Sequence, residues 1–176
     1  MKKFWAKLCT GLLAIVCLFS VSACAPKLNI DKAEKNLKDA GYTVLVADSD
    51  AELKTVVSYL GLPTNASISI EEALIAKEDE NYLYMMKVEK SSLAKVYYNM
   101  VKDSFDAEIE EQKNEIKLYE KFLKLYKGEL SSTEINYIED AIKEMKKDLE
   151  ESKEIQIGRS GKWLWVGNKQ GIKDSK

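Results

Sequence analysis

The architecture follows from residues 105–152, which read FDAEIEEQKNEIKLYEKFLKLYKGELSSTEINYIEDAIKEMKKDLEES. This stretch has no proline and a single glycine, and it is dense in glutamate and lysine. Its apolar residues fall into two series at spacings of three, four and seven: Ile109, Ile116, Tyr119, Leu123 and Tyr126, and then Ile135, Ile138, Ile142, Met145 and Leu149. Such a and d positions are typical of two consecutive helices that pack along an apolar seam.

A short break separates the two series and predicts how the helices are joined. Gly128 suits the position after a helix C-terminus, and Ser131 with Glu134 three residues later forms the pattern of an N-terminal capping box. Leu130 and Ile135 take the positions of a hydrophobic staple. Because the loop is short, the helices are expected to be antiparallel neighbours, forming a hairpin over about residues 105–154.

The residues after position 30 begin with alternating helical and strand patterns. A first helix is expected from an N-cap at Asp31 to Gly41, and a strand follows over residues 42–47. A second helix is expected from caps within residues 48–50 to Gly61. Helices and strands therefore share one domain in this chain.

Apolar alternation predicts four further strands, over residues 68–76, 82–88, 155–158 and 162–166. Ser91 and Ser92 are the expected caps of a third helix that precedes the hairpin, and Gly167 begins a short tail. The expected fold class is α+β: a small two-layer helix and sheet domain over residues 31–176, with a long antiparallel, coiled-coil-like helical hairpin inserted before the last strands.

The N-terminus has the pattern of a bacterial signal peptide. Lys2, Lys3 and Lys7 precede an apolar run over residues 8–21, which is shorter than the roughly 20 residues of a membrane-spanning helix. The run ends in Val21-Ser22-Ala23-Cys24, which closely resembles the bacterial lipobox. The resemblance implies cleavage between Ala23 and Cys24 and a diacylglycerol lipid on the Cys24 sulfur, sometimes with a further acyl chain.

This resemblance divides the chain into a lipoprotein signal peptide (1–23), a lipidated tether (24–30) and the domain, held on the extracytoplasmic face of a bacterial membrane. An ordinary secretory cleavage at Ala23-Cys24-Ala25 is the first alternative, but Pro26 would then make a poor protease substrate. An uncleaved anchor helix is the second, and the short apolar run argues against it.

Composition excludes several kinds of chemistry. The chain has no histidine, and Cys24 is the only cysteine left after cleavage, so catalytic triads, Cys–His pairs and conventional zinc sites are absent. Of the 27 basic residues three lie in the leader, which leaves 24 against 29 acidic residues, a balance that does not favour nucleic acid. We expect no catalytic residue, no metal and no cofactor other than the lipid on Cys24.

Two pairs of aromatic residues are the candidates for ligand binding. Tyr82 and Tyr84 share one face of a strand, and Trp163 and Trp165 share one face of another. Stacked aromatics of this kind bind peptides, sugars or lipids, but in a small domain without disulfides they are more often core.

Three functional hypotheses follow from the sequence. The first is a non-catalytic interaction lipoprotein, bound to the membrane by its lipid, whose hairpin meets a protein partner or a second copy of the chain. The second is a ligand-binding lipoprotein that uses the sheet aromatics. The third is a hydrolase that depends on paired carboxylates such as Glu71-Glu72.

Overall fold

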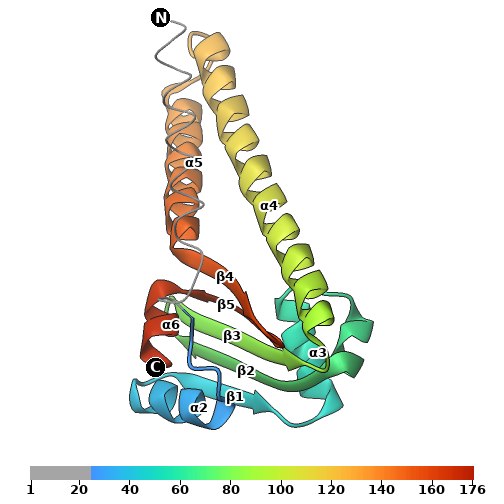
Figure 1. The fold of residues 1–176 in the computed structure, drawn as a ribbon. Helices are drawn as coiled ribbons and strands as arrows, with labels where there is room; N and C mark the ends of the chain where they lie inside the picture. Colours follow the sequence, from blue (N-terminus) through green and yellow to red (C-terminus); the bar gives the residue numbers. More distant parts are fainter. Residues whose placement is uncertain (1–24) are drawn as a thin grey trace, which may run out of the picture.

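A computed structural model describes residues 25–176, so the predicted signal peptide and Cys24 lie outside the described residues. One five-stranded antiparallel sheet forms the body of the protein, in the order β1-β2-β3-β5-β4 (Figure 1). The strands are β1 (Thr43–Ala47), β2 (Ile70–Glu78), β3 (Asn81–Val88), β4 (Ile155–Ser160) and β5 (Trp163–Asn168). The predicted α+β class with an inserted hairpin is confirmed.

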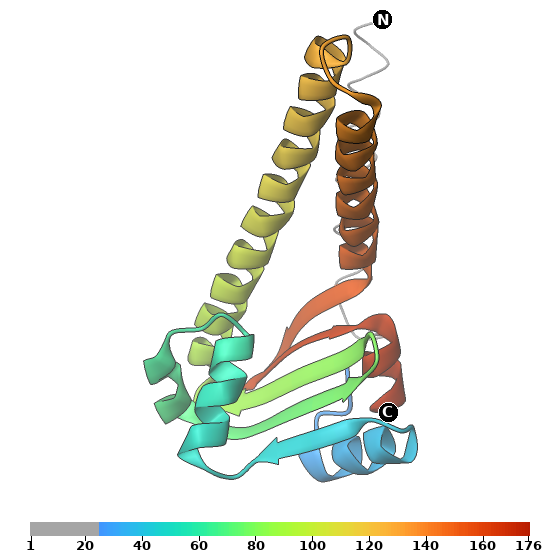
Figure 2. The same cartoon turned by 180° about the vertical axis from the view of Figure 1, so that it is seen from behind.

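Helices lie on both faces of the sheet, which gives three layers where the sequence suggested two. One face carries α2 (Ile30–Asp39) and α6 (Lys169–Asp174), and the other carries α3 (Asp50–Tyr59), the 3₁₀ helix η1 (Thr64–Ser69) and the first turns of α4 (Ser91–Tyr126) (Figures 1 and 2). The reason is that the central strands are apolar on both sides. Adjacent residues such as Met85 and Met86 are both fully buried, in different clusters.

The helical hairpin is confirmed. It consists of α4, which has 36 residues, and α5 (Ser132–Glu151), which has 20, and a short 3₁₀ helix η2 (Ser152–Glu154) leads from α5 into β4. The seam buries three of the predicted positions: Ile116, Leu123 and Ile142. Ser131 is the N-cap of α5, and its hydroxyl accepts from the Glu134 N–H at 3.3 Å while the Glu134 carboxylate accepts from the Ser131 N–H at 2.8 Å.

Helix α4 is longer than predicted, because the expected third helix and the first arm of the hairpin are one continuous helix. The predicted boundary near Phe105 came from a change in composition, and no proline or glycine lies between Ser91 and Lys127 to end a helix. The prediction that Ser91 and Ser92 cap this helix is wrong. The N-cap is Lys90, and no side chain caps the helix there.

Two other predicted starts are also shifted. The N-cap of α2 is Asn29 and not Asp31, and the Asn29 side chain accepts from the Lys32 N–H at 2.9 Å. The second predicted strand included Ile68, which lies instead in η1 with 82% of its surface exposed. The alternating serine and isoleucine residues therefore lie mostly in a 3₁₀ helix, and the strand begins only at Ile70.

The predicted C-terminal tail is in fact helix α6, which packs on the sheet. Asn168 caps it by accepting from the Gly171 N–H at 3.0 Å, and the same side chain donates to the Glu80 carbonyl at 3.1 Å in the turn between β2 and β3. Gly171 lies so close to β3 that a β-carbon there would be 2.4 Å from the Tyr82 carbonyl oxygen. Only glycine, which has no β-carbon, allows α6 to approach β3 this closely. Ser175, which follows the helix, is fully buried.

Residues 25–29, which the sequence suggested as part of a tether, lie on the domain. Ala25 and Leu28 pack against the cluster formed by α2, α6 and the sheet, and the Lys27 N–H donates to the Ser175 hydroxyl at 3.2 Å. The chain is therefore fixed to the domain directly after position 24. Among the described residues, no helix has the length and apolar character needed to cross a membrane.

Candidate functional site

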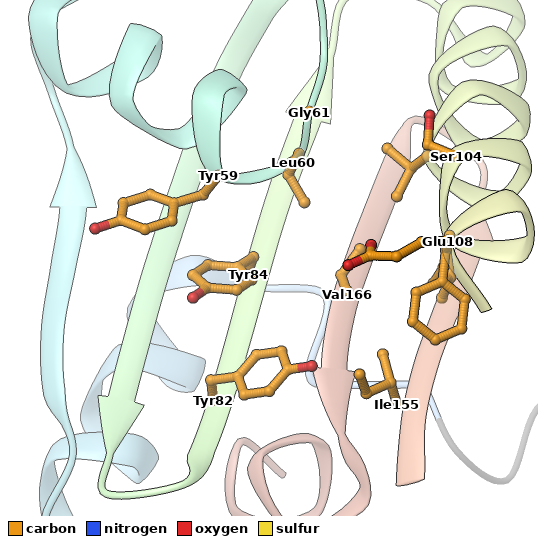
Figure 3. A pocket seen from close by; sticks show the side chains of 12 residues that line it. Tyr59, Leu60, Gly61, Tyr82, Tyr84, Ser104, Glu108, Ile155 and Val166 are labelled. Atoms are coloured by element: carbon orange, nitrogen blue, oxygen red, sulfur yellow. The ribbon is translucent and has the colours of Figure 1, made fainter. Parts of the chain in front are cut away.

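The hairpin arms diverge toward the sheet (Figure 1). A groove lies beside the base of α4 (Figure 3). It is an open cavity of about 350 Å³ between the end of α3, the lower turns of α4 and the sheet face formed by β3, β5 and β4. We call this cavity the tyrosine groove. Its apolar lining includes Leu60, Val101, Phe105, Ile155, Ile157 and Val166.

Three tyrosines stack along one side of the groove. Tyr82 and Tyr84 alternate on β3 and therefore point to the same face, and Tyr59 is the last residue of α3. The rings of Tyr59 and Tyr84 lie nearly parallel, with centroids 5.6 Å apart, and those of Tyr84 and Tyr82 are 5.3 Å apart (Figure 3). Tyr59 is 62% exposed, so the outer end of this stack is open to solvent.

Burial keeps the hydroxyls of the inner tyrosines protonated. It raises the pKa of Tyr82 to about 12, with a smaller contribution from Tyr84. Burial also raises the pKa of Tyr84, and Tyr59 adds to this shift. At neutral pH the groove therefore offers neutral aromatic faces and hydroxyl groups.

Glu108 is the only charged residue that lines the tyrosine groove. It lies one turn after Ser104 on α4, and its carboxylate is directed across the groove above Val166 (Figure 3). Within residues 25–176 this exposed carboxylate has no hydrogen-bond or ion-pair partner. The groove thus has one free negative charge at its rim.

The structure brings only half of the predicted aromatic residues to this site. Tyr82 and Tyr84 line the groove, whereas Trp163 and Trp165 lie on the opposite face of the sheet. Strand register explains the split, because Tyr84 pairs with Val166 while its neighbour Met85 pairs with Trp165.

The two tryptophans have different surroundings. Trp165 is buried over Gly158, where a β-carbon would lie 2.3 Å from the indole ring. Trp163 is half-buried, with the Lys87 ammonium 5.9 Å from its ring centre. Trp165 therefore belongs to the core. Tyr59 and Glu108 also line the groove, and no pattern in the sequence predicted them there.

A second surface feature lies at the far end of the hairpin. Four large apolar side chains of α4 are exposed on one side of the helix, next to the seam: Leu118, Phe122, Leu125 and Tyr126. We call these four residues the tip patch. Phe122 and Tyr126 are in contact, with ring centroids 5.0 Å apart. The seam does not use these residues, because α5 packs on the adjacent side of α4, so the predicted seam position of Tyr126 is wrong.

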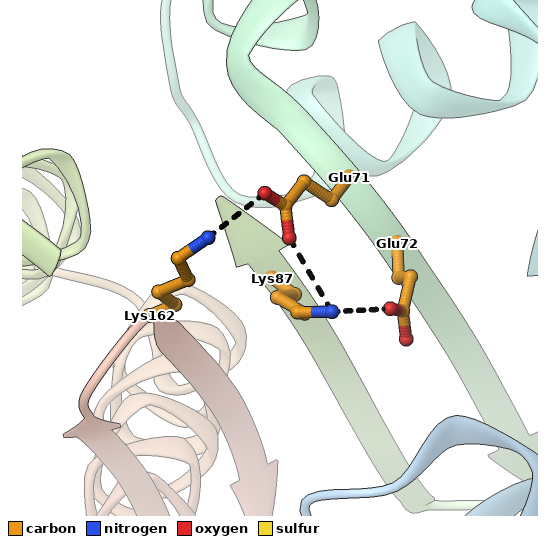
Figure 4. A network of polar contacts seen from close by, with 4 residues as sticks. All are labelled: Glu71, Glu72, Lys87 and Lys162. Carbon is orange, nitrogen blue, oxygen red and sulfur yellow. Dashed lines mark hydrogen bonds and ion pairs between the residues drawn. The ribbon is translucent and has the colours of Figure 1, made fainter. Parts of the chain in front are cut away.

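The predicted acidic pair Glu71-Glu72 forms ion pairs with two lysines (Figure 4). A register shift in β2 lets both carboxylates reach Lys87, with Glu72 at 2.5 Å and Glu71 at 3.3 Å, and Glu71 also binds Lys162 at 3.0 Å. The hydrogen bond from Lys162 lowers the pKa of Glu71, and Lys87 adds to this shift. These pairs join the ends of three strands, and residues 25–176 contain no cluster of three acidic or cysteine residues arranged to hold a metal ion.

Comparisons of the chain with protein-family models, with curated proteins and with solved structures found no significant match. Two surface features of residues 25–176 are the candidates for a functional site. The tyrosine groove is concave and carries a free carboxylate. The tip patch is apolar and lies at the end of a projecting arm.

Proposed function

We propose that the protein is a lipid-anchored extracytoplasmic lipoprotein of a bacterial membrane, and that it acts as a non-catalytic interaction module. In this proposal the hairpin extends from the domain and binds a partner protein through the tip patch. The tip patch is the observation that carries the proposal. The lipid anchor rests on the lipobox resemblance at Val21–Cys24.

Within residues 25–176 no segment covers the tip patch. Leu118 is 65% exposed and Leu125 is 62% exposed, although both lie on a helix whose neighbouring side buries a regular seam. Contiguous apolar surface of this kind, surrounded by polar residues, marks interaction sites in soluble domains. An amphipathic stripe on one helix is typically recognised by an apolar groove on a partner.

The charges beside the tip patch favour a partner with an acidic rim. Lys117, Lys121 and Lys124 follow the same stretch of α4, and among the described residues none of them has a carboxylate within ion-pair distance. Two other lysines of the hairpin, in contrast, are paired with glutamates of the opposite arm: Lys127 with Glu139 at 3.1 Å and Lys146 with Glu120 at 2.6 Å. Unpaired charges around an apolar centre increase the rate and specificity of association with a complementary surface.

The position of Ala25 supports a protein partner over the membrane itself. Ala25 directly follows the predicted lipid-bearing Cys24 and packs on the sheet domain, near the end of α6. Helix α5 separates this end of the protein from the tip by 20 residues, about 30 Å of helix. A lipid on Cys24 would therefore hold the sheet domain close to the bilayer, with the tip about 30 Å of helix away from it.

The test of the interaction combines crosslinking with a binding measurement. A photoreactive residue at Lys121 should crosslink one partner in intact cells, and the purified partner should bind the purified chain. The double variant Leu118→Glu, Leu125→Glu should weaken this binding at least tenfold, because it places two charges in the apolar contact. The matched control Ile68→Glu changes an apolar residue on the domain body that is even more exposed, and it should leave the affinity unchanged.

Two results would overturn this proposal. One is equal binding by the double variant and by wild type. The other is binding of the lipid-free chain to anionic vesicles that the double variant abolishes, which would make the tip patch a membrane contact.

The anchor has its own test. Mass spectrometry of the mature N-terminus should show a diacylglycerol-modified Cys24, and the protein should partition into a detergent phase. Cys24→Ser should shift it to the aqueous phase, because no thiol remains to take the lipid. An unmodified N-terminus at another residue in the wild-type protein would contradict the assignment.

A further inference from the structure

The geometry of the tyrosine groove points to a second binding site, and we propose that it takes a small organic cation, that is, an ammonium group carried on an apolar body. This site lies at the base of the hairpin and involves none of the tip-patch residues. It is therefore independent of the partner contact proposed above, and it adds a ligand to the protein's function.

The apolar body of the ligand is inferred from the floor and size of the groove. Val101 on α4 is buried, and Ile157 and Val166 of the sheet are half-buried, so the floor between them is hydrophobic. Its volume of about 350 Å³ lies within the range of small-molecule sites. Apolar walls with a few polar groups at the rim are the usual composition of such sites.

The positive charge of the ligand is inferred from Glu108 and the tyrosine rings. The unpaired Glu108 carboxylate faces the groove, and the exposed ring of Tyr59 and the neighbouring rings of Tyr84 and Tyr82 present aromatic faces. A cation gains from the carboxylate by charge and from the rings by cation–π attraction. An anion would be repelled by Glu108, and the hydroxyls present are too few to replace the hydration of a sugar.

No lysine of the described part of the chain already fills this role. Lys102, one turn before Asp106 on α4, pairs with that residue and is not part of the lining. Lys54 lines a separate hollow of the surface, which shares only Tyr59 with the tyrosine groove. The carboxylate of Glu108 is thus left for an external cation.

The experiment measures the affinity of the protein for three probes that have the same shape and different charges. Calorimetric titration of the mature chain carrying Cys24→Ser, which keeps every described residue, is carried out with phenethylammonium, 2-phenylethanol and 3-phenylpropionate. Phenethylammonium should bind most tightly, by about fivefold over the alcohol, and the carboxylate should bind least. Amide chemical shifts should change at Tyr84 and Glu108 on binding.

Variants separate the charge from the aromatic contribution. Glu108→Gln should remove the preference for phenethylammonium over the alcohol, while the matched control Glu110→Gln, on another side of α4, should retain it. Tyr59→Ala should weaken the binding of all three probes. The variant is expected to fold, since this side chain is largely exposed. Equal affinity for the three probes, preference for the carboxylate, no saturable binding, or an equal effect of Glu110→Gln would each overturn the proposal.

Discussion

Gly171 shows how one missing side chain fixes the C-terminus of this protein. A β-carbon at this position would lie 2.4 Å from the Tyr82 carbonyl oxygen, which belongs to the backbone of a central strand and cannot move aside. Gly171→Ala should therefore push α6 off the sheet and lower the free energy of unfolding by about 1–3 kcal/mol. Urea unfolding of the two proteins, followed by circular dichroism, measures this difference.

Gly128→Ala is the matched control for this prediction. Gly128 follows the end of α4, and a β-carbon there would meet no atom within 4 Å. Its effect on stability should stay within about 0.5 kcal/mol. Equal losses in the two variants would show that glycine content, and not the contact with Tyr82, is responsible.

Tyr82 makes stability depend on pH in the alkaline range. Its pKa is raised by burial from an ordinary value of 10.0 to about 12, so the folded protein holds this proton where the unfolded chain has lost it. The stabilisation is complete below pH 10 and is lost as the pH rises toward 12. Tyr82→Phe should lose less stability than wild type between these values, as measured by urea unfolding at each pH.

Other tyrosines contribute in the same direction and remain in both proteins. Burial and a hydrogen bond to Asp174 raise the pKa of Tyr42, and burial raises that of Tyr84. The variant should therefore keep part of the alkaline loss. Parallel curves for wild type and Tyr82→Phe would contradict the role of Tyr82.

Among the elements, α5 begins with a complete capping box at the turn of the hairpin. Ser131 and Glu134 satisfy each other's backbone N–H groups at the turn of the hairpin, where no other described side chain does so. Ser131→Ala should lower stability by about 1 kcal/mol and Ser132→Ala, one residue into the helix, by much less. Thermal unfolding followed by circular dichroism tests the pair. A similar loss in both variants would contradict the capping role.

The elements that could be predicted from sequence are those with local signals. The hairpin was predicted because its seam repeats regularly and its turn carries a glycine and a capping box. The start of α4 could not be placed, because Lys90 caps it without any side-chain signal. Helix α6 was missed since its six residues have no apolar periodicity and their helical form depends on Asn168 and on contact with β3.

The candidate site shows the same division between local and distant information. Strand alternation predicted that Tyr82 and Tyr84 share a face, and they do. The same alternation could not tell that Trp163 and Trp165 point the other way, because strand order and register are set by long-range pairing. Tyr59 and Glu108 join the groove only through the packing of α3 and α4 on the sheet.

At the scale of the whole molecule, residues 25–176 form three separate apolar clusters. Two of them lie on opposite faces of the sheet and are linked through the same strands, whereas the third lies within the hairpin and includes Ile116, Leu123 and Ile142. No described residue belongs to both the hairpin cluster and a sheet cluster. The arm and the sheet domain are therefore expected to open as separate units.

Ile142→Ala tests this division. Removing the buried side chain at the centre of the seam should cost the hairpin about 2–5 kcal/mol and speed amide exchange in α5 and in the outer half of α4 at least about tenfold. Exchange in β3 should not change, because the variant leaves both sheet clusters intact. The matched variant Val57→Ala, in a sheet cluster, should instead speed exchange in β3. Equal acceleration of exchange in α5 and β3 by Ile142→Ala would mean that the arm and the sheet unfold together. In that case, binding of a partner at the tip patch would also stabilise the groove at the base of the arm.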